Sequence, residues 1–98
     1  MTINIQKNGA VATFVVEGRL DTTTAPQLEK EISGLDVAYK NLILDLADLE
    51  YISSAGLRVL LGAQKKMSKI GSMKLTGVSE TVMDVLEMTG FADILTIE

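Results

Sequence analysis

Residues 42–46 read LILDL, and residues 54–67 read SAGLRVLLGAQKKM. The first stretch is a short, nearly continuous apolar run, which is typical of a strand covered on both faces. The second stretch repeats its apolar residues at helical spacing, and Gly71 follows just past the expected end of that helix. Together the two stretches predict a central strand followed by a helix, which is the building unit of an α/β domain.

The segment before the central strand predicts a hairpin. Ile3–Ile5 alternates with polar neighbours, Val11–Val16 is rich in β-branched residues, and Asn8-Gly9 lies between them. Asn-Gly between two such segments is a strong hairpin signal, because both turn positions then need a positive φ.

A first helix is expected over Ala25–Ser33. Thr24 is placed as its N-cap with Gln27 as the capping-box partner, and Gly34 lies just past its end. Pro26 is tolerated in the first turn of a helix. This helix would connect the hairpin to the central strand.

The segment after the second helix predicts a strand at Met73–Thr76 and a third helix with Ser79 as N-cap and Gly90 as its stop. A last strand is expected at Ile94–Ile97. The expected order is ββαβαβαβ, and alternating strands and helices favour a mixed, mostly parallel sheet. We therefore expect residues 1–98 to form one α/β domain.

Composition excludes several classes of function. The chain contains no cysteine and no histidine, so disulfides, thiolate or imidazole metal sites and Ser-His-Asp catalysis are ruled out. The net charge of −4 is opposite in sign to that of a DNA-backbone binder, so no direct nucleic-acid partner is expected. No apolar run approaches the ~20 residues of a membrane span, and no signal peptide is recognisable. We expect a cytoplasmic protein that has no membrane partner.

A functional site is expected at residues 48–57, which connect the central strand to the second helix. Ligand and reaction sites of open α/β sheets lie beyond the carboxyl ends of strands. Ser53 and Ser54 stand at the start of the helix, where free N–H groups and the helix dipole favour negative charge, so a phosphate on either would be stabilised. The alternative is structural: Ser53 is an N-cap, Ser54 fills the first turn, and Gly56 lets the helix approach the sheet.

Intrinsic catalysis is not expected. A Ser54 nucleophile would need a lysine base, and Lys65 and Lys66 lie roughly 16 Å away along the helix at 1.5 Å per residue. We therefore predict no catalytic residues, no cofactor and no metal.

Three segments in order, GRLDTTTA at residues 18–25, LILDL at 42–46 and YISSAGLRVLL at 51–61, closely resemble the STAS domain family of sulfate transporters and anti-sigma factor antagonists. The resemblance covers essentially the whole chain and implies a single STAS domain. It looks like the free-standing anti-sigma factor antagonists.

This resemblance implies a phosphorylation switch. Such antagonists sequester an anti-sigma factor that is also a serine kinase, which frees a sigma factor; phosphorylation ends the binding, and a phosphatase restores it. The family acceptor lies two residues before the motif glycine, which is Gly56 here, so it corresponds to Ser54. The chain departs from the family pattern at Ser53, where aspartate is frequent, and at Ala55, where serine or threonine is frequent; Ser53 is therefore a competing acceptor.

Two further features keep alternatives open. Asp21 matches the acidic residue of the first family motif, and it either orients the Ser54 hydroxyl or contacts the kinase, or is a turn aspartate bonded to nearby N–H groups. The segment from Arg58 to Lys74 holds five basic residues and no acidic one, which indicates either a solvated helix face or a stripe for partner docking. The alternative function is an accessory STAS subunit that binds a transporter ATPase or a nucleotide without being phosphorylated.

Overall fold

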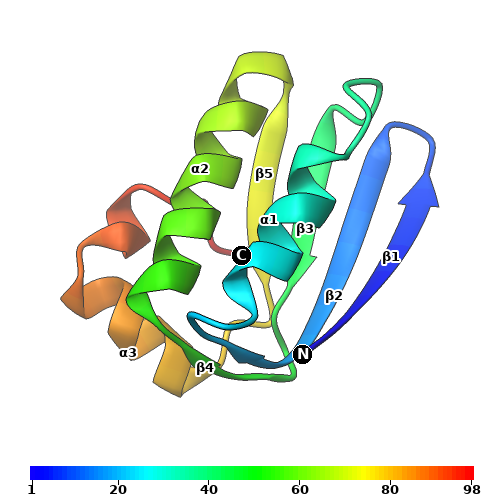
Figure 1. Cartoon of the computed structure of the whole chain (residues 1–98). Helices are drawn as coiled ribbons and strands as arrows, with labels where there is room; N and C mark the ends of the chain where they lie inside the picture. Colours follow the sequence, from blue (N-terminus) through cyan, green and yellow to red (C-terminus); the bar gives the residue numbers. More distant parts are fainter.

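The computed structural model describes all 98 residues (Figure 1). Its elements follow in the order β1 (Thr2–Asn8), β2 (Val11–Leu20), α1 (Ala25–Ser33), β3 (Asn41–Asp45), β4 (Leu49–Ile52), α2 (Ser54–Ile70), β5 (Ser72–Thr76), α3 (Glu80–Met88) and the 3-10 helix η1 (Phe91–Asp93). Four strands form the path β1-β2-β3-β5, and β4 pairs with β2 outside that path. Only β1 and β2 are antiparallel, and all other pairs are parallel, so the predicted mixed, mostly parallel sheet is confirmed.

Strand β2 organises the sheet because it pairs with three other strands. Its first half, Val11–Val15, pairs in parallel with β3 over Asn41–Asp45. Its last residues, from Gly18 to Leu20, pair in parallel with β4, and the register shifts between Gly18 and Arg19. The ends of β2 and β4 are therefore brought side by side, and this places the loops that follow them next to each other.

Helices α1 and α2 cover one face of the sheet, and α3 packs near β4 at the end of the molecule where α2 begins (Figure 1). Alternate residues of β2 point into the interface below the helices: Ala12, Phe14 and Val16 are fully buried. The helices contribute residues at helical spacing, and no polar or charged residue is fully buried. This is the burial pattern expected of amphipathic helices packed on a sheet. No helix of the chain combines the length and the apolar character that crossing a bilayer requires.

The hairpin is present, but its turn differs from the prediction. Asn8 still belongs to β1 and pairs with Val11, so the two turn residues are Gly9 and Ala10. Only Gly9 has a positive φ, of 60°. A single glycine at the first turn position is the requirement of a type II′ turn, which also suits the twist of a hairpin. The prediction that Asn8 and Gly9 both need a positive φ was wrong.

The first helix has the predicted bounds, but the capping box is wrong. Thr24 has helical dihedral angles and makes no side-chain cap bond to the helix. Its Oγ1 instead donates to the Arg19 carbonyl oxygen at 2.7 Å and accepts from the Asp21 N–H at 2.9 Å. Thr24 therefore closes the loop that precedes the helix.

The sequence prediction missed β4 and placed a strand where none forms. β4 lies inside the segment predicted to connect the central strand to α2. At the other end, Ile94–Ile97 was expected to be a strand, but Ile94 and Leu95 both donate backbone hydrogen bonds to the Phe91 carbonyl. These turn bonds leave only Ile97 to pair, in an isolated parallel bridge with Leu75.

Candidate functional site

The site lies where the parallel strands β2 and β4 end together. Leu20 is the register partner of Ile52, and the backbone N–H of Ser53 donates to the Leu20 carbonyl oxygen at 2.9 Å. The residue after each strand, Asp21 after β2 and Ser53 after β4, therefore starts a loop at the same edge of the sheet. The structure thus brings the Asp21 segment beside the two serines, as expected for loops at the carboxyl edge of a parallel pair.

The two serines have different environments. Ser53 is half-buried and is the N-cap of α2, and its Oγ accepts a hydrogen bond from the Gly56 N–H at 3.3 Å. Ser54 is the first residue of the helix and is exposed, and its hydroxyl takes no part in any side-chain hydrogen bond of the chain. Ser53 satisfies one of the free N–H groups of the helix end, as an N-cap does. Ser54 presents its hydroxyl to solvent.

Gly56 explains how closely this helix end approaches the sheet. It is buried, and a Cβ built at this position would lie 2.7 Å from Leu20 Cγ and 2.9 Å from Ile52 Cγ1. No side chain fits unless the buried side chains of Leu20 and Ile52 move. The neighbouring Ala55 is half-buried against the core. Both residues fix the position of the serines rather than present groups that react.

Asp21 is a turn aspartate. Its Oδ1 accepts from the N–H of Thr23 at 3.0 Å and from the N–H of Thr24 at 3.1 Å. These bonds, the Thr24 N–H foremost, together with the Arg19 guanidinium, hold the pKa of the Asp21 carboxyl below its usual range, against the effect of partial burial. The hydrogen bonds of Asp21 thus belong to its own loop, and none reaches Ser54. The carboxylate remains charged at neutral pH, in the loop next to the segment that carries Ser53 and Ser54.

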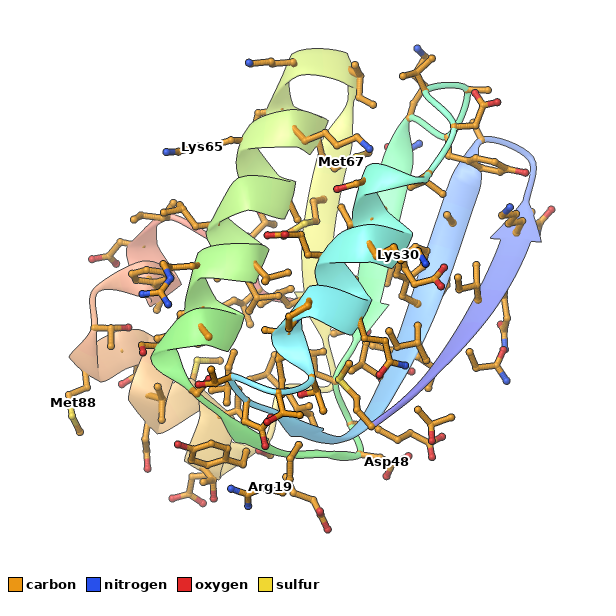
Figure 2. The ribbon with its side chains drawn as sticks, in the orientation of Figure 1. Arg19, Lys30, Asp48, Lys65, Met67 and Met88 are labelled. Atoms are coloured by element: carbon orange, nitrogen blue, oxygen red, sulfur yellow. The ribbon has the colours of Figure 1, made fainter.

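An exposed aromatic residue and an arginine flank the site, and the sequence analysis did not identify them. The Arg19 guanidinium lies 4.3 Å from the centroid of the Tyr51 ring, and the two residues are register partners on β2 and β4. Arg19 Nε is also 3.8 Å from Asp21 Oδ2. Tyr51 is 40% exposed, and Arg19 lies at the end of the molecule where α2 begins (Figure 2). The only sequence signal was the aromatic character of Tyr51 beside Ile52, which is typical of a strand.

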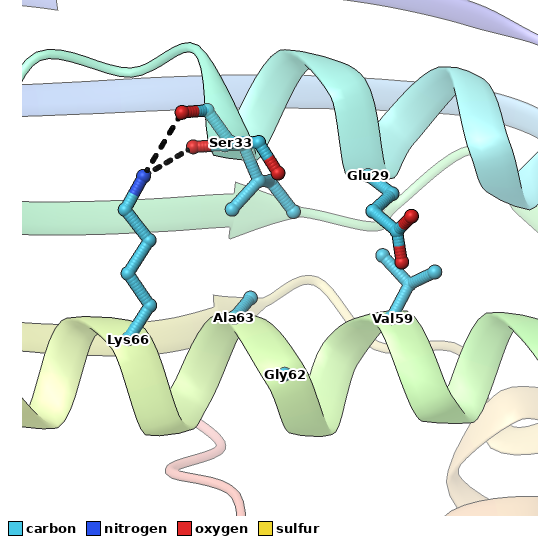
Figure 3. A pocket seen from close by; sticks show the side chains of 7 residues that line it. Glu29, Ser33, Val59, Gly62, Ala63 and Lys66 are labelled. Carbon is cyan, nitrogen blue, oxygen red and sulfur yellow. Dashed lines mark hydrogen bonds between the residues drawn. The ribbon is translucent and has the colours of Figure 1, made fainter.

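Two hollows lie between α1 and α2. A hollow of about 190 Å³ adjoins the site and is lined by Thr22, Ala25, Pro26, Glu29, Ala55, Arg58 and Val59. The second, of about 260 Å³, lies further along the helices (Figure 3). At its far end Lys66 Nζ donates to the carbonyl oxygens of Ile32 at 2.7 Å and Ser33 at 3.5 Å. Lys66 therefore binds the last carbonyls of α1 and joins the two helices.

This arrangement defines a class: an α/β domain in which an exposed serine opens a helix at the carboxyl edge of a mixed sheet. The STAS domain model matches residues 2–98. BtrV of Bordetella bronchiseptica, named as a candidate anti-sigma factor antagonist, is 33% identical over 96 residues, which cover 96% of this chain and 83% of BtrV. The anti-sigma-B factor antagonist of Bacillus subtilis is 30% identical over 98 residues, which cover 99% of this chain and 90% of that protein.

Solved structures share this fold. An anti-sigma factor antagonist from Mycobacterium paratuberculosis matches with a TM-score of 0.86 and 26% identity, over 98% of this chain and 83% of that one. The anti-sigma factor antagonist SpoIIAA in its unphosphorylated form matches with a TM-score of 0.78 and 19% identity, over 99% and 87% of the two chains. The phosphorylated form of SpoIIAA from Bacillus matches with a TM-score of 0.77 at the same identity, over 99% and 91%. The chain belongs to the STAS domain family, and its curated relatives are named as anti-sigma factor antagonists.

Proposed function

We propose that this chain is an anti-sigma factor antagonist whose binding is switched by phosphorylation of Ser54. Its partner is an anti-sigma factor that is also a serine kinase, and its binding releases a sigma factor. A phosphatase that acts on the phosphorylated form restores binding. The names of the relatives support the antagonist function, and the solved phosphorylated form of SpoIIAA supports a phosphoprotein state within this fold.

The observation that carries the proposal is the difference between the two serines. Ser53 Oγ is committed to the Gly56 N–H, whereas the exposed Ser54 hydroxyl is free to enter a kinase active site. In the transfer, Ser54 Oγ bonds to the γ-phosphorus of ATP, and the bond from that phosphorus to the bridging oxygen of ADP breaks. The hydroxyl proton passes to a base of the kinase, which also supplies the metal and most of the charge stabilisation. This chain is the substrate, so it needs no catalytic group of its own.

The phosphate is expected to leave the fold intact. A phosphoserine carries about −1.5 to −2 charges at neutral pH, and at a helix N-terminus it meets the positive end of the dipole, which stabilises by roughly 0.3–1 kcal/mol. Ser54 opens α2, so its phosphate lies at this end. The switch must then act at the interface and not through unfolding.

At the interface with the partner, the phosphate has the opposite effect and makes binding less favourable. A partner surface that receives a neutral hydroxyl would have to desolvate a dianion, with the charged Asp21 in the neighbouring loop and the nucleotide phosphates of the kinase opposite. A cost of even ~3 kcal/mol weakens binding about a hundredfold. Phosphorylation therefore releases the partner by electrostatic exclusion.

The test is mapped phosphorylation. After a pull-down with and without ATP identifies the partner kinase, incubation with that kinase and ATP should add one phosphate, which mass spectrometry should place on Ser54. Ser54→Ala should remove the label, and the matched variant Ser53→Ala should keep it. Label on Ser53, or label that persists in Ser54→Ala, contradicts the assignment. Recovery of a transporter ATPase in place of a kinase would favour an accessory STAS subunit.

A further inference from the structure

The outer face of α2 carries a stripe of exposed cations that starts at the site. Arg58, Leu61, Lys65 and Lys69 follow one another at intervals of three and four residues, which places them on one face of the helix. Ser54 lies on the same face, four residues before Arg58. The three cationic residues are exposed, and Lys65 extends from α2 on the side away from α1 (Figure 2). We call Arg58, Leu61, Lys65 and Lys69 the basic ridge.

The charge of this helix is opposite to that of the chain. Helix α2 contains four of the nine basic residues and none of the thirteen acidic ones, in a protein with a net charge of −4. The two ion pairs of the structure, Arg19 with Asp21 and Lys74 with Glu98, both lie outside α2. No carboxylate of the chain therefore pairs with the ridge. Lys66 differs, because its ammonium caps α1 within the fold.

The helix dipole explains the positions of only some of the cations in the basic ridge. A cation in the last turn, such as Lys69, stabilises the helix. Arg58 is the fifth residue of a 17-residue helix, far from the C-terminal turn, so the dipole does not stabilise its charge. No ion pair of the chain includes Arg58, so neither the dipole nor an internal carboxylate explains its position.

Leu61 gives the ridge an apolar centre. It is half-buried, yet it is not among the apolar side chains that form the core or pack against it. At the next position, Gly62, a Cβ would meet no atom within 4 Å, so the helix surface there is open to close approach. A partner that covers Leu61 would bury its apolar surface inside a rim of charged groups, and an apolar centre with a polar rim is the arrangement of protein-protein contacts.

We propose that the basic ridge docks an acidic surface of the same anti-sigma factor whose kinase site receives Ser54. The inference rests on the proposed function, and it adds a second contact that lies outside the kinase site. The ridge is continuous with Ser54 along one helix face, so a partner seated over Ser54 extends along it. The excess of unpaired cations requires that the docked surface be acidic. Lys65 and Lys69 then contribute to affinity and to the rate of encounter even though they lie up to four turns from the phosphorylated serine.

The test compares charge reversals on two neighbouring helices. The variant Lys65→Glu changes the ridge, and Lys30→Glu makes the same single reversal at an exposed position of α1 that lies outside both ion pairs. Affinity for the purified anti-sigma factor is measured by calorimetric titration at low and high salt. We expect the ridge variant to lose affinity at least about tenfold at low ionic strength, with the loss shrinking at about 1 M salt, where the screening length is about 3 Å. Leu61→Ala should lose affinity at both salt concentrations, and Lys30→Glu should bind like the wild type.

The outcomes separate this inference from the proposed function. If the wild type binds and Ser54→Asp does not, but the ridge variant binds as tightly as Lys30→Glu, the ridge is only a solvated helix face and the inference is wrong. If Lys30→Glu weakens binding as much as the ridge variant, the effect is one of net charge and the inference is again wrong. If the wild type itself does not bind the anti-sigma factor, the proposed function fails and the docking proposal fails with it. Circular dichroism of each variant confirms that the fold is retained.

Discussion

The two loops at the carboxyl edge of the sheet differ in how much of their hydrogen bonding is internal. In the loop before α1, the carboxylate of Asp21 and the hydroxyl of Thr24 bond to their own segment, and the loop is closed on itself. In the turn before α2, one hydroxyl, that of Ser53, caps the helix, and the next, that of Ser54, remains exposed. One loop is thus a fixed support, and the other presents a reactive group to a partner.

This comparison shows how a short motif can separate structural from functional residues. Asp21, Ser53 and Gly56 each have an internal partner or a packing constraint that explains them. Ser54 has neither, so the fold does not account for it. A substitution at an internally bonded residue should change stability, whereas a negative charge introduced at Ser54 should change binding and leave stability unchanged.

The largest loss of stability is expected when the start of α2 can no longer pack closely on the sheet. Gly56→Ala introduces a Cβ within 3.0 Å of Leu20 and Ile52, and overpacking of this kind costs about 1–3 kcal/mol of the free energy of unfolding. Gly62→Ala is the matched control on the same helix, because its Cβ meets nothing within 4 Å. It should be neutral or stabilise by up to about 1 kcal/mol through helix propensity. Urea unfolding of the two variants checks the contrast, and equal effects would mean that Gly56 is not a packing requirement.

Alanine substitutions at the two serines should change the free energy of unfolding by different amounts in the same urea assay. Ser53→Ala removes the N-cap bond to the Gly56 N–H and should cost about 1 kcal/mol. Ser54→Ala removes an exposed hydroxyl without a partner and should stay within about ±0.5 kcal/mol of the wild type. A larger loss in Ser54→Ala than in Ser53→Ala would show that the serine roles have been exchanged.

The smallest effect is expected from the titration of Asp21. Its pKa in the folded protein lies below the ordinary value, so the charged form stabilises the fold at pH values above about 4. This contribution decreases as the pH falls through the lowered pKa of the folded state. The difference in unfolding free energy between the wild type and Asp21→Asn should therefore be present at pH 6 and shrink below about pH 4. A difference that does not change with pH would mean that the carboxylate charge contributes nothing to the loop.

Much of the fold follows from local patterns of the sequence. The first helix has the predicted bounds, Ala25–Ser33, because its apolar spacing and flanking residues are local signals. β4 could not be found in this way, because its four residues become a strand only by pairing with the end of β2, far away in the chain. The last strand was predicted from apolar content alone, and the turn at Phe91 prevented it.

The candidate site could also be predicted only in part, because some of its contacts depend on β4, which the sequence did not reveal. The sequence motifs identified Ser53, Ser54, Gly56 and Asp21 as residues of the site, and the structure brings their two segments together. The structural interpretation of the two serines, with Ser53 as the N-cap and Ser54 in the first turn of the helix, is confirmed. The Arg19–Tyr51 contact could not be found, because it depends on the missed strand.

The measurement that tests the central claim most directly is the affinity of Ser54→Asp and Ser54→Ala for the purified anti-sigma factor, by calorimetric titration. Both variants should keep the circular dichroism spectrum of the wild type, because the residue is exposed at the start of α2. We predict that Ser54→Ala binds like the wild type and that Ser54→Asp, which places a negative charge at the interface, loses most of its affinity, up to about a hundredfold. Equal affinities of the Asp and Ala variants would contradict the claim that charge at Ser54 controls binding.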